Sequence, residues 1–245
     1  MTTVISTNSA VGLNITDANV ANGPFFVAPN VVIQSDAGSS SDAIHVTATT
    51  GDAVINVAGM LIAGDDGVQV NGGDRVVLTS TGSIFSSYGL FAGGTVGGNV
   101  FIVDGLIDAS ADGILFGSSN SGNMATIGGH VIGDRGVADS SGAGNTVRIA
   151  AGGVLEGRSF AYDLSGSGAQ SSLINHGTIL GGSQGAVTIS GISALAFTNT
   201  GVTEGAVTLG TAADSIVNSG TILGYVQLGG GADSFTALGS GVVSG

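Results

Sequence analysis

The segment that decides the fold reads Asn218-Ser219-Gly220-Thr221-Ile222-Leu223-Gly224, and a near copy reads Asn175-His176-Gly177-Thr178-Ile179-Leu180-Gly181. Both segments contain a glycine, one variable residue and then an apolar residue, and this skeleton recurs along the chain. The recurring glycines are Gly59, Gly82, Gly105, Gly129, Gly153, Gly177, Gly201, Gly220 and Gly239, with successive spacings of 23, 23, 24, 24, 24, 24, 19 and 19 residues. A repeat period of this length predicts a solenoid of stacked turns.

Three further patterns keep step with these glycines. Two positions after them stand Leu61, Ile84, Ile107, Val131, Leu155, Ile179, Thr203, Ile222 and Gly241, of which seven are aliphatic. A second set of alternating apolar residues includes Ile44/Val46, Val68/Val70, Ile114/Phe116, Val187/Ile189 and Val207/Leu209. A third set pairs an Asp or Asn with an apolar or small residue two positions later, as in Asp52/Val54, Asp74/Val76, Asn99/Phe101, Asn123/Ala125, Asn145/Val147, Asp214/Ile216 and Asp233/Phe235. Two turns, near Ser171 and Ser193, lack the polar residue of this third set. Alternation with period two predicts strands with one buried face.

Each period therefore predicts three short strands separated by glycine-rich corners, which is one turn of a parallel β-helix. We expect a single right-handed parallel β-helix of about nine to ten rungs, with 19–25 residues in each. Stacked rungs lie ~4.8 Å apart, so equivalent side chains form columns. Residues 39–245 are assigned to this helix, and residues 1–38 to an N-terminal cap with an irregular first rung. The cap contains both prolines, which belong at sheet edges, and an apolar cluster, Phe25-Phe26-Val27, suited to covering the first rung.

The composition limits the classes of partner. The 245 residues include 4 Lys and Arg against 17 Asp and Glu, for a net charge of −13. Such a chain repels nucleic acid and attracts cations. It contains no cysteine, so neither disulfides nor thiolate metal sites are expected. The sequence shows no N-terminal signal peptide and no apolar run long enough for a transmembrane helix. We expect an extracellular or cell-surface protein that is exported without a visible N-terminal signal.

Two resemblances bear on function. The segment Leu228-Gly229-Gly230-Gly231-Ala232-Asp233-Ser234-Phe235 resembles one nonapeptide of the RTX calcium-binding repeats, G-G-x-G-x-D-x-U-x, with Leu228 in place of the first glycine. This resemblance implies calcium as a cofactor, held by Asp214, Asp233, Gly229 and Gly231. The alternative is a corner whose carboxylates accept backbone N–H groups. The Asn-x-Gly-Thr-Ile and Gly-Ala-Val-Thr-Ile/Leu segments are similar to the solenoid repeats of secreted bacterial adhesins and autotransporter passenger domains.

Several other polar groups are candidate sites. Asp65 and Asp66, with Asp74, form an acidic spot, and Asp104, Asp108 and Asp112 form another. Arg135 and Arg158 are 23 residues apart, which suggests stacking on one corner, and they adjoin Asp134 and Glu156 in sequence. His45, His130 and His176 fall in different ladders, so no histidine metal site is expected. We read Asn99, Asn123 and Asn145 as stacked amides that bond one another. The sequence has no aromatic cluster to hold sugar rings and no repeated acidic–basic pair, and we expect no catalytic activity.

The function predicted from sequence is that of a non-catalytic secreted structural protein: an adhesin, a fibre subunit or a surface-layer element. The last rung ends at Val242-Val243-Ser244-Gly245 without a polar cap. We therefore expect end-to-end contact with other copies or with further solenoid rungs, with calcium as a stabiliser and cell-surface polysaccharide as a candidate partner. Two alternatives stay open: a polysaccharide-active β-helix lyase or hydrolase, and a phage spike-like trimeric rod.

Overall fold

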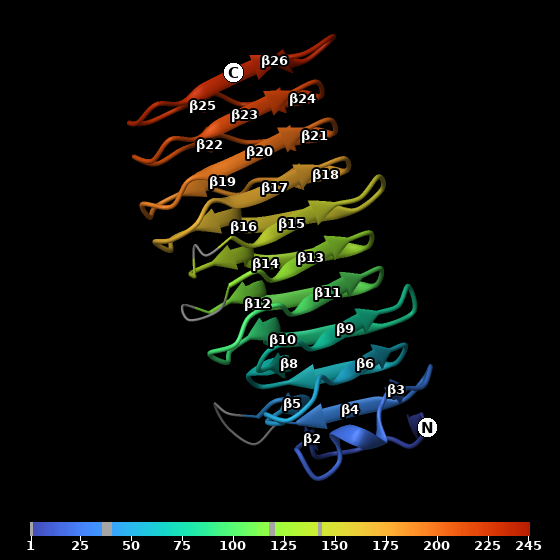
Figure 1. Cartoon of the computed structure of the whole chain (residues 1–245). Helices are drawn as coiled ribbons and strands as arrows, with labels where there is room; N and C mark the ends of the chain where they lie inside the picture. The colour runs from blue at the N-terminus through green and yellow to red at the C-terminus, as the bar shows by residue number, and fades with distance from the viewer. Residues whose placement is uncertain (1, 36–40, 118–120, 142–143) are drawn as a thin grey trace.

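The protein is an all-β solenoid of about ten stacked turns, as predicted. The structure is a computed structural model that describes residues 2–35, 41–117, 121–141 and 144–245. Figure 1 shows the turns lying on one another along a single axis, with the N-terminus and the C-terminus at opposite ends. Neighbouring strands are parallel in both sheets, because each turn brings the chain back in the same direction one level along the axis.

In the described part of the chain, one sheet contains eleven strands, one from each passage of the chain along that side. In spatial order its strands are β1 (Thr3–Ile5), β3 (Phe25–Val27), β6 (Val54–Val57), β9 (Arg75–Leu78), β11 (Val100–Val103), β13 (Met124–Ile127), β15 (Thr146–Ile149), β17 (Ser171–Asn175), β20 (Leu195–Asn199), β23 (Ser215–Asn218) and β26 (Ser234–Ala237).

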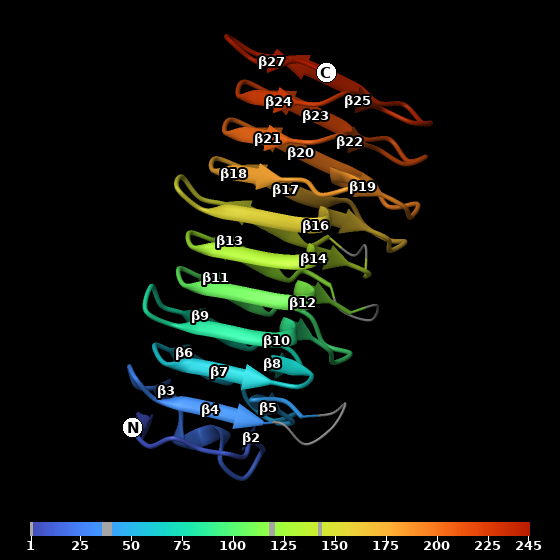
Figure 2. The ribbon, with the colours of Figure 1, turned by 180° about the vertical axis from the view of Figure 1, so that it is seen from behind.

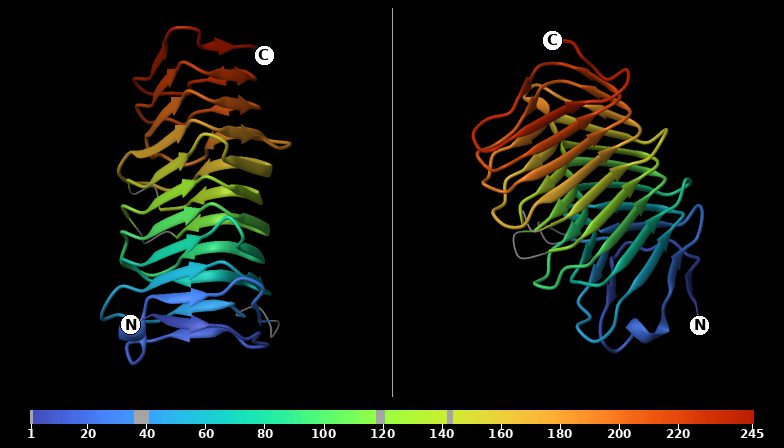
Figure 3. Two further views of the ribbon diagram at one scale, coloured as in Figure 1. Left: turned by 90° about the vertical axis from the view of Figure 1, so that its right-hand side faces the viewer. Right: turned by 45° about the horizontal axis from the view of Figure 1, so that its top comes forward.

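The other sheet has sixteen strands within the described residues and forms the remaining two sides of the solenoid. Its strands are β2 (Leu13–Ile15), β4 (Val32–Ser35), β5 (Ile44–Val46), β7 (Met60–Ala63), β8 (Asp66–Val70), β10 (Ser83–Ala92), β12 (Leu106–Phe116), β14 (His130–Asp139), β16 (Val154–Leu164), β18 (Thr178–Leu180), β19 (Gly185–Ile189), β21 (Val202–Glu204), β22 (Val207–Thr208), β24 (Thr221–Leu223), β25 (Val226–Gln227) and β27 (Val242–Val243). In the central turns, two of the three predicted strands merge into one long strand with a register shift at its bend. Figure 2 shows these long strands from behind, and Figure 3 shows the stacked turns from two further directions.

The first apolar column forms as predicted through most of the chain. Ile107 pairs with Ile84 on one side and with Val131 on the other, and all three are fully buried. Two details differ from the prediction. The column starts earlier, since Ile33 pairs with Leu61. In the last turn its member is Val243 and not Gly241, because this turn is two residues longer at that corner.

The third column also needs one correction. Val76 pairs with Ile55, so the polar position of that turn is Ala53 and not Asp52. The predicted pair Asp52/Val54 is therefore one residue out of register. In the turns near Ser171 and Ser193, which were predicted to lack an Asp or Asn, the equivalent positions are Ser171 and Leu195.

Glycines occupy two kinds of corner for different reasons. Along the first ladder the turns approach closely: a Cβ added at Gly129 would collide with the backbone carbonyl of Gly105, and one at Gly201 with that of Gly177. The corner before the polar column instead requires a left-handed backbone, for example at Gly122, where φ is 66°. Stacking distance thus explains the repeat glycines from Gly59 to Gly220. In the last turn Gly241 takes this role, because an added Cβ would meet the Asn218 carbonyl, whereas Gly239 has a φ of 57° and open space around it.

The N-terminal segment is irregular but carries four strands. The predicted boundary at residue 38 falls in 36–40, outside the described residues. Phe25 and Val27 do not cover the end of the helix, because β3 lies between β1 and β6 as an ordinary member of the first sheet. A short 3₁₀ helix, η1 (Val20–Asn22), follows β2 and packs Val20 against the core.

Candidate functional site

The predicted calcium corner lies in the last two turns, where β23 and β26 pair in register and place Asp233 next to Asp214. Asp233 Oδ1 accepts the backbone N–H of Asp214 at 2.9 Å, and Asp214 Oδ1 accepts that of Leu195 at 2.7 Å. Gly229 and Gly231 have φ values of 81° and 120°. One oxygen of each carboxylate therefore binds the preceding turn, as the hydrogen-bonded alternative proposed. Calcium at these four residues remains a prediction.

The two arginines considered for catalysis do not stack. Arg135 lies opposite Phe160 in the next turn, because the bends of β14 and β16 differ in length, and Arg158 stands two residues earlier. The Arg135 guanidinium donates to both oxygens of Asp112, at 2.7 and 2.8 Å, and to Asp163 at 3.2 Å. These ion pairs connect different turns. The partners of Arg135 are therefore not Asp134 and Glu156, the carboxylates that adjoin the two arginines in sequence.

The acidic group Asp104, Asp108 and Asp112 is divided between different surroundings. Asp112 is buried beneath Arg135, whereas Asp108 accepts Arg158 at 2.6 Å and Asp104 is exposed. Burial raises the pKa of the Asp112 carboxyl, and the hydrogen bonds and charge of Arg135 partly offset that effect. The ion pairs tie adjacent and next-nearest turns together.

The three histidines each take a separate partner. The pairs are His45 Nδ1 with Asp42 at 2.8 Å, His130 Nε2 with Glu156 at 3.0 Å, and His176 Nδ1 with Thr200 at 2.7 Å.

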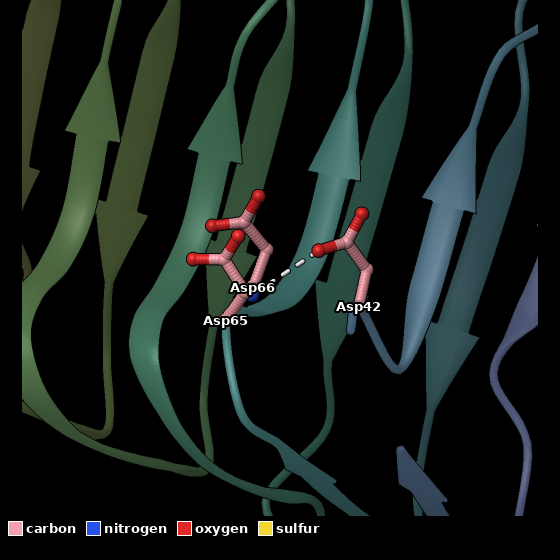
Figure 4. Close-up of side chains that lie close together, drawn as sticks. All are labelled: Asp42, Asp65 and Asp66. Atoms are coloured by element: carbon pink, nitrogen blue, oxygen red, sulfur yellow. Dashed lines mark hydrogen bonds between the residues drawn. The ribbon is translucent and has the colours of Figure 1, made fainter. Parts of the chain in front are cut away.

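Three carboxylates converge at the N-terminal ends of β5 and β8. One oxygen from each of Asp42, Asp65 and Asp66 lies within 4.8 Å of the others. Figure 4 shows Asp65 and Asp66 leaving one turn side by side, with Asp42 on the adjacent turn. We call these three residues the acidic triad.

The stacking register creates the triad. Ile44 pairs with Val68, so the residues two positions earlier, Asp42 and Asp66, meet across adjacent turns. The backbone N–H of Asp66 donates to Asp42 Oδ1 at 3.3 Å. Like charges are thus brought together by the same 24-residue period that aligns the apolar column.

The triad opens on a cavity of about 370 Å³. Its polar wall comprises the triad, His45 and Gln69, and its apolar wall comprises Tyr88, Phe91 and Leu115. The rings of Tyr88 and Phe91 lie 6.3 Å apart. A slightly larger cavity of about 430 Å³ lies among corner loops around Asp52, Gly72 and Val96, and Asp52 is the one charged residue among the described residues that line it.

Electrostatic strain concentrates on Asp66. Its residue is 3% exposed, and its Oδ1 is buried without a hydrogen-bond partner among the described residues. Burial, with further repulsion from Asp42 and Asp65, raises the pKa of the Asp66 carboxyl from 3.8 to about 8. Burial and the charge of Asp42 also raise the pKa of Asp65. The triad therefore favours either a bound proton or another positive charge.

The sequence indicates only part of this cluster. Asp65 and Asp66 were predicted to form an acidic spot with Asp74, but the Asp74 carboxylate accepts the backbone N–H groups of Ala53, Asn71 and Gly72 at another corner. Asp42 takes the third place in the triad. The 24-residue interval between Asp42 and Asp66 was the signal that could have identified it.

The titration of Asp66 predicts that the protein is more stable at pH 5 than at pH 8 when divalent cations are chelated. The folded state holds a proton that the unfolded chain releases near pH 3.8, so this stabilisation is lost as the pH rises toward about 8. The Asp66→Asn variant has no titratable group at this position. We therefore expect its free energy of unfolding to fall less steeply with pH, by roughly 1.4 kcal/mol per pH unit. Urea unfolding of both proteins from pH 5 to 8 in a chelator measures this difference. Parallel curves would contradict it.

Comparisons of the chain with protein-family models, with curated proteins and with solved structures found no match. Among the described residues, no helix has the length and apolar character required to cross a bilayer.

Proposed function

We propose that the chain is a non-catalytic structural solenoid that binds a second copy through its C-terminal turn, residues 224–245. The exposure of two residues that continue the buried core columns carries this proposal. Phe235 pairs with Ile216, and Val243 pairs with Ile222. Ile216 and Ile222 are 0% exposed, whereas Phe235 and Val243 are 37% and 41% exposed. A solenoid buries such a cross-section by adding another layer.

The edge strands of this turn lack the usual protection against pairing. β26 and β27 are the last strands of the two sheets in the described chain, and neither contains a charged residue or a proline. Natural edge strands are commonly blocked by lysine, proline or inward-pointing charge. The exposed backbone groups of β26 and β27 therefore support pairing with another strand.

Charge permits contact at this end. The chain has a net charge of −13, but residues 224–245 contain a single charged side chain, Asp233. Two acidic rods repel each other least where their charge density is low. Residues 1–35 are equally poor in charge, with Asp17 alone, so the choice of the C-terminal turn rests on its exposed apolar residues and edge strands.

The N-terminal end is better covered. Val20 of η1 packs against the core, and Ile15, although it lies in the first-turn strand β2, is 0% exposed. This difference between the ends supports a closed dimer in which two C-terminal turns face each other about a two-fold axis. Stacking of C-terminus on N-terminus would instead grow into a filament. A dimer joined through its C-terminal turns is a rod of twice the length of one chain. Such a rod suits a fibre, surface-layer or adhesive element, because it holds its exposed surfaces at fixed distances from one another.

Light scattering after size exclusion, over a range of protein concentrations, tests the proposal. We expect the mass of two 23.5 kDa chains. Phe235→Asp and Val243→Asp are each expected to weaken the dimer at least tenfold, because charge is placed in a buried apolar contact. Val11→Asp and Ile192→Asp are matched controls at residues that are 71% and 70% exposed elsewhere, and they should leave the mass unchanged.

Other outcomes distinguish the alternatives. A monomer at all concentrations would reject the interface and favour further solenoid rungs as the cover of this turn. Three chains would favour the spike-like rod, and filaments in electron micrographs would favour stacking of unlike ends. Cleavage of acidic polysaccharides by the purified chain would contradict the non-catalytic assignment and favour the polysaccharide-active alternative.

A further inference from the structure

We propose that the acidic triad, Asp42, Asp65 and Asp66, binds one calcium ion at the mouth of the adjoining cavity. This site lies at the opposite end of the chain from the Asp214/Asp233 corner that the sequence resemblance indicated. It is also independent of the C-terminal interface, so either proposal can fail without the other.

The spacing of the triad suits calcium. The three carboxylate oxygens lie within 4.8 Å of one another. Calcium–oxygen distances are about 2.3–2.6 Å, so two oxygens on opposite sides of one ion are separated by up to about 5 Å. A single calcium ion can therefore contact all three carboxylates with only small side-chain rotations.

Asp66 supplies the observation that points to a ligand. Its residue is 3% exposed, it lines the cavity, and its Oδ1 is buried without a donor among the described residues. Leaving a buried acceptor unpaired costs about 1–3 kcal/mol, and more for a charged group. The other buried acceptor of this kind in the described chain, Asp214 Oδ2, belongs to a carboxylate whose Oδ1 already binds a backbone N–H.

No arginine neutralises the triad from the cavity. Among the described lining residues the one basic side chain is His45, and its ring Nδ1 is paired with Asp42 at 2.8 Å. Arg135, by contrast, donates to both oxygens of the buried Asp112. Asp42 therefore has donors, whereas Asp66 Oδ1 has none among the described residues.

The type of ligand favours calcium over other metals. The donors are hard oxygens, with no thiolate available in the chain, and such oxygens suit calcium and magnesium better than zinc. Calcium completes six to eight ligands in irregular geometry, whereas magnesium demands a near-ideal octahedron. Gln69 and several water molecules in the 370 Å³ cavity can supply the remaining oxygens.

Isothermal titration of the metal-stripped full chain with calcium chloride tests this site. We expect one ion per chain, an affinity for magnesium and zinc at least tenfold weaker, and a higher melting temperature with calcium. Asp65→Asn and Asp66→Asn should each reduce calcium affinity at least tenfold. Asp104→Asn, an exposed carboxylate outside the triad, should bind as the unaltered protein does, and so should Asp233→Asn.

Circular dichroism first establishes that each variant is folded, and Asp65→Asn keeps the test valid should Asp66→Asn unfold. Absence of calcium binding at 10 mM would overturn the proposal. So would unchanged affinity in a folded Asp65→Asn variant, or loss of binding in Asp233→Asn alone, which would place the ion at the C-terminal corner. Tighter binding of magnesium or zinc would overturn the choice of metal.

Discussion

Asp139→Ala is expected to lower the free energy of unfolding by at least about 4 kcal/mol, because several buried donors would lose their acceptor. Asp139 ends β14 and is 0% exposed. Its Oδ1 accepts Ser141 Oγ at 3.0 Å and Asn145 Nδ2 at 2.9 Å. Its Oδ2 accepts Ser171 Oγ at 2.8 Å and the Tyr162 hydroxyl at 3.3 Å. Alanine would also leave a cavity the size of the carboxylate.

Chemical denaturation followed by circular dichroism measures this loss. Tyr162→Phe is the matched control, since it removes one hydroxyl from the same network and is expected to cost about 1 kcal/mol. Asp139→Asn retains one acceptor oxygen and should fall between these values. A cost below about 1 kcal/mol for Asp139→Ala would show that water replaces the carboxylate, and would contradict the assigned role.

Gly129→Ala is expected to destabilise the solenoid by about 3 kcal/mol or more, because overpacking at this corner cannot be relieved by side-chain motion. A Cβ at this position would meet the carbonyl oxygen of Gly105 and the backbone of Asp104 in the preceding turn. Relief requires the two turns to separate, which would lengthen hydrogen bonds such as that from the His130 N–H to the Gly105 carbonyl, now 2.9 Å.

Two further glycines distinguish the two reasons for glycine at a corner, which are close stacking of turns and a left-handed backbone. Gly122 has a φ of 66° but nothing within 4 Å of an added Cβ, so Gly122→Ala should cost only the roughly 1–2 kcal/mol of a left-handed alanine. At Gly230 the nearest atoms would lie 3.9 Å away, and Gly230→Ala should be nearly neutral. Melting temperatures of the three variants provide the comparison. Equal effects at Gly129 and Gly122 would contradict close stacking as the reason for the repeat glycines.

The polar column shows how far the sequence pattern extended. Asn99, Asn123 and Asn145 were predicted to bond one another, and the side-chain amides do so at 3.0 and 3.1 Å. A second ladder of stacked asparagines was not predicted, although Asn175, Asn199 and Asn218 each stand two residues before a repeat glycine. Their amides bond in series at 2.8 Å, and all three are fully buried. The recurrence of Asn-x-Gly in successive turns therefore indicates this second ladder.

The errors share one physical origin. The last member of the first column was placed at Gly241 and not at Val243, and one polar position at Asp52 and not at Ala53. A period read from sequence is an average, whereas the length of each corner is fixed by packing against the adjacent turn. A change of one or two residues in a corner leaves the strands paired but moves a side chain to a different column.

The repeat by itself determined that the chain forms parallel strands in stacked turns, because a single turn cannot bury its own apolar stripe and an evenly spaced series can. The tertiary structure alone decided which polar groups meet. Arg135 joins Asp112 and Asp163, and Asp42 joins Asp65 and Asp66, across turns whose bends differ in length. Such contacts depend on shifts of one residue and on side-chain direction, and a periodic pattern specifies neither.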